Sequence, residues 1–67
     1  EFMMNALRLN EGVSAASFEA YTGLSLQAIE PRLRHARRAG FMEADEEILR
    51  ATVLGRTFLN NLLMMFS

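Results

Sequence analysis

The segment Phe18–Ser25, with the sequence FEAYTGLS, decides the fold because it predicts two helices joined by a tight turn. The helix before the turn begins at Ser14 or Ser17, since a serine hydroxyl can accept a hydrogen bond from a free N–H of the first helical turn. Gly23 ends that helix, because glycine readily adopts the positive φ that suits a helix C-terminus. Ser25 can then cap the helix that follows.

The helix after the turn carries an unbroken apolar stripe and ends at Gly40. Its apolar residues recur at intervals that place them on one helical face: Leu26, Ile29, Leu33, Ala36 and Ala39. Pro31 is the exception to the pattern, because proline inside a helix removes a hydrogen bond and clashes with a carbonyl. Either the helix kinks there, or a separate short turn comes first and Pro31 opens the helix proper. The continuous stripe favours the kink.

A small β-hairpin is predicted next. Its arms, Phe41–Ala44 and Leu49–Thr52, flank the acidic turn Asp45–Glu47. Phe41 and Leu49 are expected to point inward. Helix, helix, tight turn, helix and hairpin in this order match a winged helix-turn-helix. The sequence therefore predicts one winged-helix domain over residues 1–67, mainly α-helical with a small β-hairpin.

Two further helices lie at the ends of the chain. Glu1–Leu9 forms the first, and Gly12 reverses the chain after it. Val53–Phe66 forms the last, with Thr52 as its N-cap. Apolar residues occupy nearly its whole circumference, and such a helix is usually buried on all sides. A chain of 67 residues is too short to cover it completely.

We therefore predict an interdomain contact surface at the two ends of the chain. Methionine adapts to irregular partners, and clustered exposed apolar side chains mark an interface. The proposed interface residues are Glu1, Phe2, Met3, Met4, Arg8, Met64, Met65 and Phe66. In isolation, the domain is expected to self-associate through them. The chain starts at Glu1 rather than at methionine, so we expect it to be a fragment of a longer protein.

The composition excludes several kinds of site within these residues. There is no cysteine, so there is no disulfide and no thiolate ligand for zinc or an iron–sulfur cluster. The single histidine, His35, cannot form a multi-histidine metal centre. It is expected to be an ordinary surface histidine, with an axial ligand to haem iron as the alternative. We assign no catalytic, cofactor-binding or metal-binding residue.

The arginines of the third helix raise the question of DNA binding. Arg34, His35 and Arg38 lie opposite its apolar stripe and form an exposed face. The net charge is −1 and the hairpin tip is acidic, which disfavours contact with phosphates. We therefore expect no nucleic-acid partner.

The sequence also bears on membranes and location. The longest apolar run, Leu62–Phe66, is much shorter than the ~20 residues that span a bilayer. We see no apolar segment behind a basic one that would form a signal peptide, and expect a cytoplasmic protein.

Three blocks of the sequence resemble a known family. They are Glu1–Leu9 (EFMMNALRL), Tyr21–Leu24 (YTGL) and Gly55–Phe66 (GRTFLNNLLMMF). They are similar to the C-terminal domain of oxygen-independent coproporphyrinogen III oxidase-like radical SAM proteins, the HemN/HemW family. The chain looks closer to the HemW haem-chaperone branch than to the oxidase. The positions that match are Glu1, Asn5, Leu7, Arg8, Leu9, Thr22, Gly23, Gly55 and Asn60.

The resemblance implies the role of an accessory domain. In that family, the domain follows a radical SAM barrel that holds a [4Fe–4S] cluster through a Cys-x3-Cys-x2-Cys motif and binds S-adenosylmethionine. The oxidase acts in porphyrin biosynthesis, and the chaperone branch binds haem. The present residues contain none of the cluster motif, so they would dock on the barrel, with Glu1 and Arg8 as polar contacts. The alternative is an independent winged-helix module that binds DNA or protein.

Overall fold

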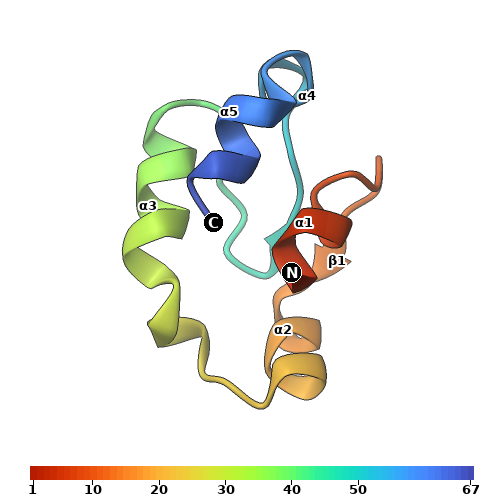
Figure 1. Cartoon of the computed structure of the whole chain (residues 1–67), viewed down its shortest axis with the longest axis vertical. Helices are drawn as coiled ribbons and strands as arrows, with labels where there is room; N and C mark the ends of the chain where they lie inside the picture. Colours follow the sequence, from red (N-terminus) through yellow and green to blue (C-terminus); the bar gives the residue numbers. More distant parts are fainter.

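The computed structural model describes residues 1–67 as helices packed around one apolar core, with a two-stranded antiparallel sheet. It measures 29 × 22 × 21 Å. The elements in chain order are α1 (Phe2–Ala6), β1 (Val13–Ser14), α2 (Ala15–Thr22), the 3-10 helix η1 (Leu26–Ala28), α3 (Glu30–Arg38), β2 (Ile48–Leu49), α4 (Val53–Thr57) and α5 (Leu59–Met64). Figure 1 places α3 along one side of the molecule and α1, β1 and α2 along the other. No helix has the length and apolar character needed to cross a bilayer.

The predicted turn between α2 and η1 is confirmed. Gly23 has a φ of 73° and its N–H bonds to the Glu19 carbonyl, which ends α2. Thr22 supports the turn from both sides, because its Oγ1 donates to the Phe18 carbonyl (2.6 Å) and accepts from the Leu24 N–H (3.1 Å). The start of α2 lies after Ser14, whose Oγ hydrogen bonds to Ser17 Oγ instead of capping the backbone.

The prediction of one helix kinked at Pro31 was wrong, and the alternative of a separate short turn before the helix is correct. Ile29, with φ −116° and ψ 6°, has a non-helical conformation, so η1 and α3 are separate helices. Ser25 caps η1 by accepting from the Gln27 N–H. Pro31 lies in the first turn of α3, where its missing N–H would have no intrahelical partner. The apolar stripe survives the break because Ile29 and Leu33 both remain in the core.

The hairpin after α3 is present, although its regular strand pairs elsewhere. The Glu43 N–H donates to the Arg50 carbonyl, and Met42 and Ala51 form a β-bridge. The strand β2, however, pairs antiparallel with β1, in the register Val13 to Leu49 and Ser14 to Ile48. The sequence reasoning missed β1. Leu49 is fully buried as predicted, whereas Phe41 is only partly buried against the core; the neighbouring Met42 is the buried residue of that arm.

The predicted last helix is two helices. Phe58, with φ −112° and ψ 46°, separates α4 from α5. Thr52 caps α4 as predicted, since its Oγ1 accepts from the Gly55 N–H (3.0 Å). The same hydroxyl donates to the Gly40 carbonyl (2.6 Å), which anchors α4 to the end of α3. Because α4 is anchored there and α5 is held by the core, the chain changes direction between them.

The first helix is also shorter than predicted. Regular α1 ends at Ala6, and turns carry the chain to Gly12, whose φ is 68°. The fully buried Leu7 directly follows α1. The core joins both ends of the chain with the middle: Met3, Leu7, Ala15, Phe18, Ile29, Leu33, Ala36, Met42, Leu49, Ala51, Leu62, Leu63 and Phe66. The two termini consequently lie near each other (Figure 1).

Candidate interdomain surface

Two residues of the predicted interface lie in the core. Met3 is 4% exposed and Phe66 is 8% exposed, and both belong to the central apolar cluster. Placing them on an exposed surface was wrong, because the inner side of α1 and the end of α5 close the core between them. Both side chains therefore stabilise the domain itself.

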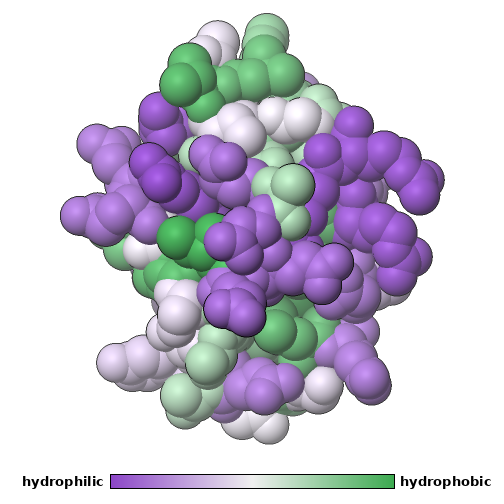
Figure 2. All heavy atoms as spheres, turned by 180° about the vertical axis from the view of Figure 1, so that it is seen from behind, coloured by the Kyte–Doolittle hydropathy of each residue, from purple (hydrophilic) through white to green (hydrophobic).

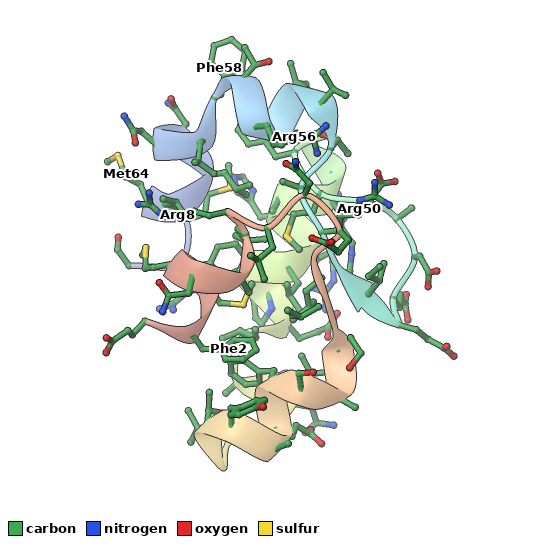
Figure 3. The ribbon with its side chains drawn as sticks, turned by 90° about the vertical axis from the view of Figure 1, so that its right-hand side faces the viewer. Phe2, Arg8, Arg50, Arg56, Phe58 and Met64 are labelled. Carbon is green, nitrogen blue, oxygen red and sulfur yellow. The ribbon has the colours of Figure 1, made fainter.

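The other members at the chain ends form a partly exposed surface, which we call the α1–α5 edge: Glu1, Met4, Arg8, Met64 and Met65. Met64 is 73% exposed, and Met4 and Met65 are half-buried against the core. Arg8 Nε donates to the Met4 carbonyl (3.0 Å), which holds its guanidinium close to α1. Figure 3 shows Arg8, in the turn after α1, and Met64 of α5 at the same side of the molecule. The α1–α5 edge thus carries both an adaptable apolar side chain and a cation.

Phe2 joins this edge to the end of α2. Its ring packs edge-on against buried Phe18, with centroids 5.6 Å apart, and stacks on Tyr21 at 6.2 Å. Tyr21 is 81% exposed, and Leu24 in the following turn is also exposed. Phe2 is therefore a half-buried link between the core and an exposed aromatic ring, rather than a free interface residue.

The structure adds an apolar surface that sequence reasoning did not single out, the α4 patch: Phe41, Val53, Leu54 and Phe58. Val53 is 72% exposed, and Leu54 and Phe58 are about half exposed. The rings of Phe41 and Phe58 stack with centroids 6.1 Å apart. Figure 2 shows hydrophobic side chains gathered at the upper end of the molecule, where Figure 1 places α4. The available signal was the pair of apolar residues directly after the Thr52 cap.

The exposed polar face of α3 is as predicted. Arg34, His35 and Arg38 are exposed, and Leu33 and Ala36 on the opposite side are buried. Arg37 has a different role, because its Nε donates to the Glu43 carbonyl (3.0 Å) and ties α3 to the hairpin. This hydrogen bond of Arg37 to the hairpin was not predicted from the sequence.

The chain contains no pocket, and no three His, Cys, Asp or Glu side chains are grouped so that they could hold a metal ion. The features available for recognition are therefore surfaces.

The residues of the three sequence blocks divide into structural and exposed positions. Leu7 lies in the core, and Thr22 and Gly23 form the turn after α2. Gly55 lies against the backbone of Phe41, where a Cβ atom would overlap the carbonyl oxygen. The exposed positions are Glu1, Asn5, Arg8, Leu9 and Asn60. Three of these, Glu1, Asn5 and Arg8, are in or next to α1, so the matched surface positions are concentrated near the α1–α5 edge.

Comparison with known proteins identifies the family. Residues 1–58 match the model of the HemN C-terminal domain. The heme chaperone HemW of Escherichia coli (strain K12) is 39% identical over 66 residues, which cover 98% of this chain and 18% of that protein. The heme chaperone HemW of Haemophilus influenzae is 38% identical over 66 residues, with 98% and 17% covered. No solved structure matches significantly.

The present chain thus spans less than a fifth of the length of these relatives. The match runs through α1, the turn after α2 and the close contact of α4 with Phe41, the same features that hold the fold together. Since the family model covers most of the residues and both relatives align along nearly all of them, the chain belongs to the family of HemN C-terminal domains.

Proposed function

We propose that this chain is the accessory C-terminal domain of a haem-related radical SAM protein, and that it docks on the barrel of the same polypeptide. The observation that carries the proposal is the α1–α5 edge, where Met64 is 73% exposed beside half-buried Met4 and Met65. Exposed apolar side chains of this kind favour an interface. The relatives are more than five times as long as the matching segment, which leaves ample polypeptide to cover such an edge.

The finer fold proposal is a winged helix. β1 lies between the first two helices and pairs with β2, and the Met42–Ala51 bridge adds the other hairpin arm beside it. The chain order supports that assignment: α1, β1, α2, α3, the hairpin arm that contains Met42, and β2. The hairpin tip Asp45–Glu47 then corresponds to the wing, held to α3 by Arg37.

We further propose that the chemistry of the parent protein lies outside these residues. A [4Fe–4S] cluster needs thiolate ligands, and this chain contributes none because it has no cysteine. Both relatives are named heme chaperones, which favours haem as the cargo of the parent over oxidation of a porphyrin precursor. The domain itself would contribute surface to the barrel rather than reacting groups.

The test compares two charge insertions in the full-length protein. Met64→Glu introduces a carboxylate on the α1–α5 edge, and Val53→Glu introduces one on the α4 patch at a matched exposure of 72%. A docked Met64 would lose about 1.5–3 kcal/mol of burial, whereas an exposed site changes by about 0.5 kcal/mol or less. We expect hydrogen exchange of α5 amides to accelerate roughly tenfold or more in Met64→Glu only.

The same variants in the 67-residue domain, measured at a concentration where it is monomeric, provide the control, because both side chains are exposed there and neither substitution should change the exchange of α5 amides. Equal and unchanged exchange in the two full-length variants would contradict docking through either surface. Faster hydrogen exchange in full-length Val53→Glu alone would show that docking uses the α4 patch and would overturn the assignment to the α1–α5 edge.

A further inference from the structure

The seven arginines of the chain divide into two groups by what their side chains contact. Four of them donate a hydrogen bond to a main-chain carbonyl: Arg8 to Met4, Arg37 to Glu43, Arg50 to Asn10 and Arg56 to Ala51. The other three, Arg32, Arg34 and Arg38, make none of the hydrogen bonds within the domain. All three lie on α3. The cations without an internal role are therefore concentrated on one helix.

Two of these three share a single exposed face with His35. Arg34 and Arg38 are four residues apart, so they are neighbours on the helix surface at about 6 Å, and both lie opposite buried Leu33 and Ala36. Like charges at this spacing destabilise a helix by a few tenths of a kcal/mol. The only acidic residue of α3 is Glu30 in its first turn, four residues before Arg34 and eight before Arg38. Glu30 is placed to offset the charge of Arg34 but lies two helical turns from Arg38, so the repulsion within the pair is only partly compensated.

We propose that the exposed face of α3, formed by Arg34, His35 and Arg38, binds an acidic surface of a separate protein. Guanidinium groups recognise carboxylates through paired, parallel N–H···O bonds. The guanidinium groups of Arg34 and Arg38, one helical turn apart, can therefore bind two carboxylates at similar spacing. An acidic partner removes the repulsion between Arg34 and Arg38 and gains a charge-assisted contact with each.

The charge distribution favours a protein over a nucleic acid. The hairpin tip Asp45–Glu47 is tied to α3 through Arg37, whose Nη2 lies 3.4 Å from the Asp45 carbonyl oxygen. A polyanion laid along α3 would meet these three carboxylates next to the arginines, and the whole chain carries a net charge of −1. A local acidic patch on a folded protein contacts the arginines without extending over the tip.

The face is separate from the α1–α5 edge. Figure 1 places α3 along the side of the molecule opposite α1, with α5 between them, and Figure 3 shows Arg8 and Met64 at the left while α3 lies behind the other elements. Docking through the edge and binding through α3 can therefore occur together. The two proposals fail independently, because each depends on different side chains.

The experiment measures binding of a fluorescent deca-glutamate peptide to the full-length protein at ~20 mM and ~200 mM NaCl. The variant is Arg34→Gln/Arg38→Gln. The matched control, Arg50→Gln/Arg56→Gln, removes the same two charges from outside α3. We expect saturable binding that weakens steeply with salt, about tenfold weaker binding in the α3 variant, and near-normal binding in the control. Circular dichroism establishes that each variant is folded.

Three results would overturn the proposal. The first is no binding of the peptide to the unaltered protein at low salt. The second is an equal loss in the two double variants, which would mean that overall charge and not the α3 face governs binding. The third is duplex DNA that binds more tightly than the peptide at equal salt and is lost in Arg34→Gln/Arg38→Gln, which would make α3 a nucleic-acid surface.

Discussion

Gly55 is a position at which a single added methyl group should damage the fold severely. A Cβ atom built there overlaps the Phe41 carbonyl oxygen and lies 2.9 Å from the Phe41 carbonyl carbon and 3.1 Å from its Cα. These are backbone atoms, so no flexible side chain can move away. The same Phe41 oxygen accepts the Thr52 N–H (3.0 Å), and Thr52 Oγ1 accepts the Gly55 N–H. Gly55→Ala must therefore separate α4 from the hairpin arm that starts at Phe41.

The magnitude follows from four contributions. Overpacking costs about 1–3 kcal/mol, and weakening the hydrogen bond to Phe41 and the Thr52 cap costs about 1 kcal/mol each. The better helix propensity of alanine returns about 1 kcal/mol. The net loss is about 2–4 kcal/mol, against a total stability of roughly 3–10 kcal/mol for a domain of this size. Gly55→Ala should thus remove a large part of the unfolding free energy.

The assay is urea unfolding of the 67-residue domain followed by circular dichroism. Gly23→Ala is the matched control, because Gly23 has a φ of 73° but nothing lies within 4 Å of an added Cβ. It should lose only the roughly 1–2 kcal/mol of a left-handed alanine. A Gly55→Ala domain as stable as the unaltered chain, or more stable, would refute the close approach of α4 to Phe41.

Two further predictions use other parts of the domain. Leu62→Ala should lower the unfolding free energy by about 2–5 kcal/mol because Leu62 is fully buried, whereas Met64→Ala, exposed on the same helix, should change the urea midpoint little; similar losses would place Met64 in the core. His35→Ala should leave the Soret spectrum in a haem titration unchanged, since the exposed imidazole is flanked by Arg34 and Arg38 on α3; a Soret shift that this substitution abolishes would make His35 a haem ligand.

Features that depend on neighbouring residues were predictable from the sequence. The turn at Thr22 and Gly23 and the cap at Thr52 follow from the chemistry of a few adjacent atoms. The buried side of α3 follows from spacing that needs only a helix. The exposed face of Arg34, His35 and Arg38 was predictable for the same reason, as its complement. The resemblance to the HemN/HemW family, carried by three short blocks, is confirmed by the comparisons.

Features that depend on contacts between distant segments were not. β1 is two residues long and has no strand signal of its own; it exists because Val13 and Ser14 meet β2 some thirty-five residues later in the chain. Met3 and Phe66 are alike in sequence to their exposed neighbours, and only the meeting of the two chain ends buries them. Nonlocal contacts likewise decide that the exposed apolar residues include Val53, Leu54 and Phe58 of the α4 patch and exclude Met3 and Phe66.

The sequence by itself therefore determined the helical character of this domain, its central turn, the caps at Ser25 and Thr52, and its family. Tertiary structure decided where the helices break and which apolar residues remain exposed. The physical reason is that a helix tolerates several endpoints at similar free energy, and the contact that selects one is nonlocal. Gly55 against Phe41 holds α4, Leu62 and Leu63 hold α5 in the core, and Phe58 between them adopts the conformation that joins the two.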